Sequence, residues 1–396
     1  MPKFPHTALS SITIAIAMAH STALSAKIYS TSKFKSNLFT VPKFKNKEFF
    51  IMGFRNIRTI PSPEAIRSLI PFSNELAAIK KENDKKIADI ITGKDDRFLA
   101  IVGPCSADDE EAVMEYMNKL KEVSDEIKEK VLVVPRVYTG KPRTTGEGYK
   151  GMLHQPDPTK EPNMLDGLLA TRKIFIRVIE ETGMPVADEM LYPSNTPFVE
   201  DLLSYIAVGA RSVENQQHRL TASCIDCAVG MKNPTSGDLT VMFNSIKAAQ
   251  HSHHFIYNGR EVETTGNPLA HAIMRGSVNK HGNNLPNYHY EDLILAYSRY
   301  TSKEGEFENP AVIVDVNHSN SGKKYMEQPR IVKEVLHSRS YNGYIRSMVK
   351  GVMIESYLVG GNQNGSEPHV YGKSITDPCL GFEDTKELLL DIAERV

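Results

Sequence analysis

The sequence predicts a (β/α)8 barrel, and three observations support this fold class. From Phe98 onward, short apolar runs alternate with amphipathic segments of helical spacing, which indicates βαβ units and a parallel sheet. Eight such runs occur, and this number fits a closed barrel in a chain of this length. No glycine fingerprint follows the first run, and this argues against a doubly wound open sheet, the alternative architecture.

The eight expected strands are short and mainly apolar. The first two, FLAIVGP and VLVVPRV, are separated by a long charged segment. Two later ones, AVGAR and AVGMK, consist largely of small residues. In chain order, the expected strands cover residues 98–104, 131–137, 185–190, 207–211, 228–232, 271–276, 310–318 and 350–356.

A helix is expected after each strand. The segment 109–130 combines helical spacing with dense charge, and the segment 163–183 ends at Gly183, a residue that commonly terminates helices. In chain order, the expected helices cover residues 109–130, 163–183, 197–205, 212–222, 238–250, 288–301, 325–339 and 383–396.

Two segments lie outside the alternation. Residues 62–93 predict one or two helices before the barrel. Residues 253–266 predict a small inserted hairpin, because Asn258-Gly259 is a strong turn signal. We therefore expect a helical extension at 52–97 and a catalytic barrel at 98–396.

The first 51 residues differ from the rest of the chain. They contain no acidic residue before Glu48, and the apolar stretch 12–19 is too short to span a membrane. The segment faintly resembles a secretory signal or an organellar transit peptide. The favoured interpretation is a disordered or cleavable leader upstream of Met52.

Composition limits the class of function. The formal net charge of −1 argues against a nucleic-acid partner or a membrane surface for the chain as a whole. The four cysteines among 396 residues are too few for a secreted disulfide scaffold and suit a reducing compartment. We expect a cytoplasmic protein, with a targeting leader at 1–51 as the alternative.

Ionisable residues follow all eight expected strands. Catalytic groups of (β/α)8 barrels lie at the carboxyl ends of the strands, so these positions are the candidates for chemistry. In chain order they are Cys105, Arg136 followed by Lys141, Glu189, Arg211, Lys232, Arg275, His318 and Glu355. Any one of these residues has an ordinary explanation as a polar loop residue, but an ionisable group after all eight strands is hard to explain in that way.

The cations among them predict an oxyanion site. The stretch RVYTGKPRTTGEGYKG at 136–151 is especially rich in positive charge. Arginine offers a planar fork of donors and lysine a compact charge, a combination that suits phosphate and carboxylate. The converging cations would be Arg136, Lys141, Arg143, Arg211, Lys232 and Arg275.

The remaining residues predict a metal site. Cys105, His318 and Glu355 would meet at one end of the barrel, and Asp377 is a plausible fourth ligand. Each residue alone is more often a buried thiol, a hydrogen-bonded imidazole or a surface charge. Mixed sulfur, nitrogen and oxygen donors suit one divalent ion such as Mn²⁺, Fe²⁺, Co²⁺ or Zn²⁺.

Seven motifs then resemble one enzyme family, type I 3-deoxy-D-arabino-heptulosonate 7-phosphate (DAHP) synthase, and they occur in the family's order. The likeness runs from about Arg55 to the carboxyl terminus. The motifs are GPCS (103–106), KPRTT (141–145), GARSVENQQHR (209–219), GMKN (230–233), NHSN (317–320), ESYLVGGNQ (355–363) and YGKSITD (371–377).

The resemblance implies a metal-dependent transferase of the shikimate pathway, which makes aromatic amino acids. The family condenses phosphoenolpyruvate with erythrose 4-phosphate and releases phosphate. The implied metal ligands are Cys105, His318, Glu355 and Asp377. The implied phosphoenolpyruvate residues are Arg136, Lys141, Arg211, Lys232 and Arg275, with Glu189 nearby. Arg143 and Thr144 would bind the phosphate of erythrose 4-phosphate, and Lys141 would be the catalytic acid.

Departures and rivals remain. The family's GWKG is GYKG at 148–151, and the hairpin at 253–266 is shorter than in amino-acid-inhibited relatives, so feedback by phenylalanine or tyrosine stays open. One rival is a phosphoenolpyruvate-condensing sugar-acid synthase that acts on another aldehyde. Another is a catalytically inactive phospho-metabolite sensor. The expected partners are small molecules and a second copy of the chain, as a homodimer or homotetramer.

Overall fold

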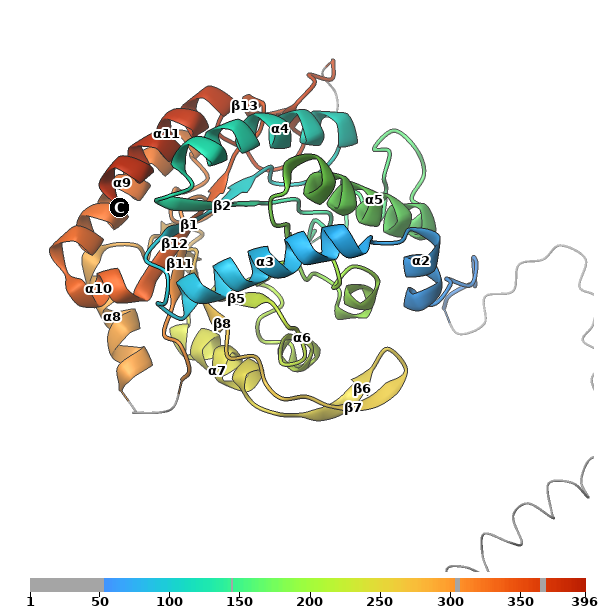
Figure 1. Ribbon diagram of the computed structural model, residues 1–396, viewed down its shortest axis with the longest axis horizontal. Helices are drawn as coiled ribbons and strands as arrows, with labels where there is room; N and C mark the ends of the chain where they lie inside the picture. The colour runs from blue at the N-terminus through green and yellow to red at the C-terminus, as the bar shows by residue number, and fades with distance from the viewer. Residues whose placement is uncertain (1–52, 144, 303–306, 364–367) are drawn as a thin grey trace, which may run out of the picture. The chain divides into compact units, whose positions relative to one another are not determined.

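Eight parallel strands form the central sheet of the protein (Figure 1). The computed structural model describes residues 53–143, 145–302, 307–363 and 368–396. The strands follow one another in the order β2-β1-β12-β11-β8-β5-β4-β3. Their bounds are β1 Phe98–Gly103, β2 Val131–Pro135, β3 Ala187–Glu189, β4 Tyr205–Val208, β5 Ala228–Lys232, β8 Ala270–Met274, β11 Val312–Asp315 and β12 Val349–Glu355.

The sheet closes between its two end strands, β2 and β3. A single parallel bridge joins Arg136, the residue after β2, to Ala187 of β3. The N–H of Val137 also donates to the carbonyl oxygen of Ala187 at 2.8 Å. We call this junction the β2–β3 seam. The architecture is thus the predicted (β/α)8 barrel.

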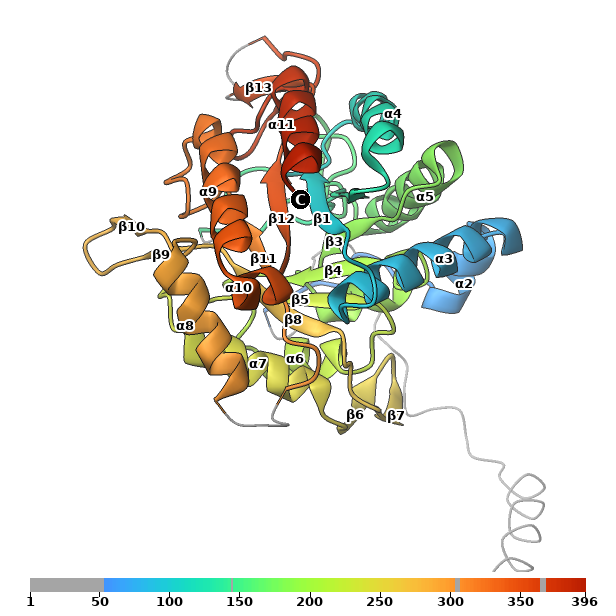
Figure 2. The same cartoon turned by 60° about the vertical axis from the view of Figure 1, so that its left-hand side comes forward.

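Helices surround the strands, as Figure 2 shows. The side chain of Asp109 accepts the N–H of Ala112 and begins the first of them, and Gly183 ends the second in the left-handed conformation with φ +66°. Their bounds are α4 Glu110–Ile127, α5 Met164–Thr182, α6 Gln216–Ala222, α7 Leu239–Gln250, α8 Tyr290–Thr301, α9 Gln328–Tyr341, α10 Gly343–Met348 and α11 Phe382–Arg395.

Two expected helices differ from the prediction. The helix expected at 197–205 is wrong: a short 3-10 helix, η1, covers Pro193–Phe198, and turns follow it. Pro197 lies inside η1, and the guanidinium of Arg172 binds the carbonyl oxygen of Phe198 at 2.7 Å, where an α-helix would need that oxygen. The helix expected from residue 212 begins only at Gln216, after Asn215 caps it.

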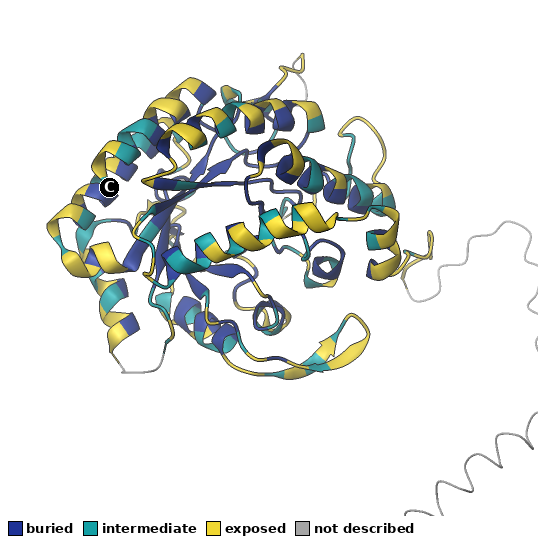
Figure 3. Ribbon diagram, in the orientation of Figure 1, coloured by how far each residue is buried: buried dark blue, intermediate teal, exposed yellow. Residues whose placement is uncertain are grey.

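The strands of the barrel are buried (Figure 3), and two apolar clusters make up the core. Alternate residues of β1 fall into different clusters, since Phe98 packs in the outer one and Leu99 in the inner one. The inner cluster also contains Ile87, Ile90 and Ile91 of helix α3. These isoleucines close the amino-terminal end of the barrel, so the opposite end remains for chemistry.

The remaining elements decorate the barrel. The predicted hairpin is present as β6 His254–Tyr257 and β7 Arg260–Glu263, which pair antiparallel. Its turn places Asn258 and Gly259 at positive φ. Within the described ranges, no helix has the length and apolar character that a membrane crossing needs. The other elements are α2 Pro63–Leu69, α3 Asn74–Ile91, β9 Ser277–Val278, β10 Asn284–Leu285, η2 Tyr325–Glu327, β13 Val359–Asn362 and β14 Lys373–Ser374. Residues 60–396 form one unit, and residues 53–59 belong to a second.

Candidate active site

A polar cavity of about 280 Å³ lies at the carboxyl ends of the strands. Its lining brings together nearly all the residues that the sequence singles out. Glu355 is buried and contacts the lining residue Arg136, whereas Thr144 lies outside the described residues. The expected residues that line the cavity are Cys105, Arg136, Lys141, Arg143, Glu189, Arg211, Lys232, Arg275, His318 and Asp377.

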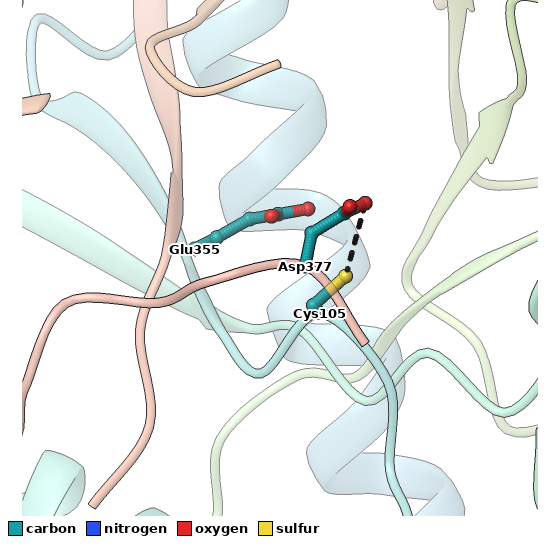
Figure 4. A group of neighbouring side chains, drawn as sticks. All are labelled: Cys105, Glu355 and Asp377. Atoms are coloured by element: carbon teal, nitrogen blue, oxygen red, sulfur yellow. Dashed lines mark hydrogen bonds between the residues drawn. The ribbon is translucent and has the colours of Figure 1, made fainter. Parts of the chain in front are cut away.

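Cys105, Glu355 and Asp377 form a compact cluster of ligand atoms (Figure 4). One sulfur or oxygen atom from each residue lies within 4.8 Å of the other two. Parallel pairing accounts for part of this: Gly103 of β1 is in register with Glu355 of β12, so Cys105 emerges beside that carboxylate. The sulfur of Cys105 lies 3.7 Å from Oδ2 of Asp377.

His318 faces the same cluster. Its Nε2 lies 3.8 Å from Oε1 of Glu355, and its Nδ1 lies 2.8 Å from Oδ2 of Asp315. The backbone of His318 has φ +36°, a strained value for a residue with a side chain. The fold therefore holds the imidazole in a costly conformation that turns Nε2 toward the carboxylates.

These four residues fit a divalent metal. Their sulfur, nitrogen and oxygen donors match the ligand types of borderline ions. Asp315 fixes the imidazole through its second nitrogen, as carboxylates do for metal-binding histidines. The amide of Asn317 donates to Oε2 of Glu355 at 2.6 Å and so orients that carboxylate as well.

Lys141 joins the cluster to the cavity. Its ammonium donates to the sulfur of Cys105 at 2.6 Å and to Oδ2 of Asp377 at 3.0 Å. Burial acts to lower the pKa of Lys141, but Cys105, Asp377 and Glu355 outweigh it and raise the pKa above its usual value. Lys141 is therefore an ammonium donor at neutral pH.

Arg136 is a buried cation with an unused donor. Its Nη2 donates to Oε1 of Glu355 at 2.6 Å, and its Nε donates to the carbonyl of Pro104. Its Nη1 is buried without a hydrogen-bond partner among the described residues. An orphaned guanidinium N–H at a polar cavity is suited to a bound anion.

Three further cations, Lys232, Arg275 and Arg211, line the same cavity. Lys232 is buried, with Nζ 3.6 Å from Asp315 and 3.8 Å from Glu189. Burial lowers the pKa of Arg275; Asp315 opposes this effect, and the neighbouring Arg211 adds to it. Two guanidinium groups that destabilise each other mark a place where an anion would be stabilised.

Several site residues escaped the sequence analysis, among them Lys323, whose ammonium donates to Oδ1 of Asp377 at 3.0 Å. Asp315 ends β11 and holds His318, Asn317 orients Glu355, and the side chain of Gln328 binds both backbone groups of Glu355. Asp315 offered the clearest signal, because a carboxylate interrupts the apolar run PAVIVDV. Nothing in the sequence pattern distinguishes Gln328 from a helix surface residue.

Comparison with known proteins agrees with this geometry. Residues 74–390 match the model of the DAHP synthetase I family. A relative from Haemophilus influenzae, phospho-2-dehydro-3-deoxyheptonate aldolase, is 36% identical over 341 residues, which cover 84% of this chain and 91% of the relative. A Trp-sensitive enzyme of that name from Escherichia coli K12 is 36% identical over 348 residues, covering 86% and 96%.

A solved structure shows the same fold. It is the phospho-2-dehydro-3-deoxyheptonate aldolase of Francisella tularensis SCHU S4, which matches with a TM-score of 0.80 and 33% identity. The match covers 87% of this chain and 98% of that one. A family match across most of the barrel, together with a cavity built from the family's motifs, leads to one conclusion: the chain belongs to the DAHP synthetase I family.

Proposed function

We propose that the protein is a DAHP synthase, a transferase that condenses phosphoenolpyruvate with D-erythrose 4-phosphate and releases inorganic phosphate. One observation carries this proposal: seven cations, the six expected ones and Lys323, border the cavity that also receives Cys105, His318 and Asp377. Two phosphates and one carboxylate must be neutralised together in this reaction, and such a density of positive charge supports that requirement.

The strand-end cations would bind phosphoenolpyruvate. Arg136 has an unpartnered Nη1, and Lys232 and Arg275 are buried nearby, so they can hold the phosphate and carboxylate of one small ligand. Arg211 is the exposed member of this group. Glu189 limits the position of Lys232 through the 3.8 Å contact.

The loop that follows β2 would bind the second substrate. Arg143 lines the cavity and donates through Nε to the carbonyl oxygen of Tyr149. Together with Thr144, it is the candidate for the phosphate of erythrose 4-phosphate. The aldehyde of that substrate then lies within reach of Lys141, two residues earlier in the loop.

The chemistry needs one proton donor and one divalent ion. The ion, held by Cys105, His318, Glu355 and Asp377, would supply Lewis-acid polarisation of the aldehyde. Carbon 3 of phosphoenolpyruvate forms a bond to the aldehyde carbon, and Lys141 protonates the oxygen that becomes a hydroxyl. Water adds its oxygen to carbon 2, and one of its protons restores the ammonium of Lys141. The bond from carbon 2 to the phosphate oxygen then breaks, the second water proton leaves with inorganic phosphate, and a ketone remains at carbon 2.

One assay tests the proposed function. Purified protein is mixed with Mn²⁺ and both substrates, and the enol absorbance of phosphoenolpyruvate is followed. We expect consumption only when erythrose 4-phosphate is present. Consumption with a pentose 5-phosphate instead would favour the sugar-acid synthase. If phosphoenolpyruvate is not consumed with any divalent metal, the protein is not a condensing enzyme, and the inactive phospho-metabolite sensor becomes the favoured hypothesis.

Asp315→Asn should weaken metal binding without removing a ligand. The substitution keeps the volume but removes the carboxylate that fixes Nδ1 of His318, so affinity should fall about 10-fold to 100-fold. Titration of metal-free protein with Mn²⁺ measures this change. An affinity equal to that of the unaltered protein would show that Asp315 serves its other partners, Lys232 and the N–H of Asn317, and not the metal site.

Assembly and location complete the proposal. We expect a homodimer or homotetramer in the cytoplasm. All four cysteines lie in the described part of the chain and are free thiols, which fits a reducing compartment.

A further inference from the structure

A buried hydrogen-bonded pair, Thr139 and Asp188, spans the β2–β3 seam. The N–H of Thr139 donates to Oδ1 of Asp188 at 3.0 Å, and its hydroxyl donates to Oδ2 at 2.7 Å. The N–H of Glu189 donates to the same Oδ1 at 2.7 Å. Both side chains are almost fully buried, with exposed fractions of 2% for Thr139 and 6% for Asp188.

The surroundings of Asp188 are unusual for a carboxylate. It borders a cavity of about 40 Å³ that is lined mainly by apolar side chains, among them Leu168, Leu203 and Ile206. Burial raises the pKa of Asp188 to about 7, and the hydrogen bonds from Thr139 and Glu189 only partly offset it. Burying a carboxyl group there costs folding free energy. Buried polar groups of this kind can contribute to the choice of one conformation even where they do not add stability.

The pair replaces backbone pairing that the seam lacks. Beyond the bridge of Arg136 and Ala187, no further strand pairing joins β2 to β3 among the described residues. Asp188 accepts the N–H of Thr139 at Oδ1 and its hydroxyl at Oδ2, three residues past the bridge. The carboxylate thereby extends the closure of the barrel into the segment that leads to Lys141.

Thr139 also anchors the base of the catalytic loop, which we define as residues 139–141 and 150–153. The N–H of Leu153 donates to the carbonyl oxygen of Thr139 at 3.0 Å, and the N–H of Lys141 donates to that of Lys150 at 2.9 Å. Gly151 makes this approach possible, because a Cβ there would lie 2.2 Å from the Thr139 oxygen. Thr139 therefore connects the two chain segments of the loop base, because it belongs to the first and binds the second.

We propose that Thr139 and Asp188 act as a latch that holds the loop base against β3 and so aims Lys141 and Arg143 into the cavity. Both are positioning residues for the condensation, and this inference rests on the proposed function of the loop. The strand-end cations Lys232 and Arg275 lie outside the loop, so the latch acts on one substrate more than on the other.

The test is Thr139→Val, which keeps the shape and removes only the hydroxyl. We expect kcat to fall about 10-fold to 100-fold, because small misplacements of reacting groups have effects of this size. The KM for erythrose 4-phosphate should rise by a larger factor than the KM for phosphoenolpyruvate, because Lys141 is the one expected phosphoenolpyruvate residue that the loop carries. Thr139→Ser, which restores the hydroxyl, should recover most of the activity. An unchanged kcat in folded Thr139→Val would overturn the latch.

Thr182→Val is the matched control. Thr182 is also a buried threonine with two hydrogen bonds, to Val178 and Met184, but it ends α5 and has no contact with the loop base. It should lower the melting temperature and leave kcat and both KM values unchanged. If Thr139→Val shows this same pattern, its contribution is to stability alone and the proposal is wrong.

Amide hydrogen exchange provides a readout that does not depend on activity. In substrate-free Thr139→Val, peptides covering 139–143 and 150–153 should exchange faster, and peptides from β8 and β11 should not. If Thr139→Val fails to fold, Asp188→Asn is measured in the same way and should show the same local increase. If the variant and the unaltered protein exchange equally fast in these peptides, the latch is refuted. If the loop peptides exchange faster but the unaltered protein has no condensing activity, only the proposed function is refuted.

Discussion

Lys141→Ala should lower kcat by about 100-fold to 10,000-fold, the range that a lost general acid commonly produces. The ammonium of Lys141 donates to two members of the ligand cluster, at 2.6 Å to the sulfur of Cys105 and 3.0 Å to Oδ2 of Asp377. Alanine removes the ammonium that is proposed to protonate the aldehyde oxygen during attack. Because Lys141 is proposed as an acid and not as a ligand, the variant should still bind one metal ion.

Steady-state kinetics and metal analysis of the same preparation check this expectation. Lys150→Ala is the control, since Lys150 is an exposed cation of the same loop whose backbone, and not its side chain, binds Lys141. It should retain nearly full kcat. A Lys141→Ala variant within about tenfold of the unaltered enzyme, a difference of only about 1.4 kcal/mol, would assign the proton to another group.

His318→Ala should remove metal and activity together. Loss of a direct ligand should weaken affinity by more than the approximately 100-fold that loss of a supporting residue can cause. The strained backbone at φ +36° can also relax once the imidazole is gone, so the substitution should not greatly reduce the free energy of unfolding. Activity should return in part when excess Mn²⁺ is added.

Equilibrium dialysis against Mn²⁺ measures the metal content, with His337→Ala as the control because His337 is exposed on α9. Excess Mn²⁺ should not restore Lys141→Ala, so the two variants separate loss of the proton donor from loss of the ion. Stoichiometric metal in His318→Ala after dialysis would exclude the imidazole as a ligand.

The barrel could be predicted because its elements are consistent with their local sequence. Strands such as β1 are apolar along their whole length, and helices such as α4 begin at a capping residue, Asp109, that is visible in the sequence. The ionisable residues at the strand ends could be placed together for the same reason. Once parallel strands are identified, their carboxyl ends must share one end of the barrel.

The segment around η1 could not be predicted because distant residues decide it. The sequence of 197–205 has helical spacing, but Arg67 and Arg172 bind the carbonyl oxygens of Pro197 and Phe198 from elsewhere in the fold. Each guanidinium also pairs with Asp201, which fixes the turn that follows. Contacts of this kind depend on tertiary structure and leave no local pattern.

The supporting residues of the site were missed for a related reason. Asp315 and Asn317 both precede the proposed ligand His318 closely in sequence, yet their importance lies in which atom each one binds, and spacing does not report this. Gln328 acts on the backbone of a residue 27 positions away. Patterns in the sequence identify groups that can do chemistry more readily than the groups that orient them.

The β2–β3 seam ties the integrity of the barrel to the occupancy of its cavity. Among the residues that the structure describes, Arg136 provides the one backbone bridge of the seam and also a buried Nη1 without a hydrogen-bond partner. An anion that binds Arg136 only in the closed barrel stabilises the closed form by mass action. Thermal opening of the barrel at the β2–β3 seam therefore competes with substrate binding. The seam should open less often when the cavity holds substrate than when it is empty.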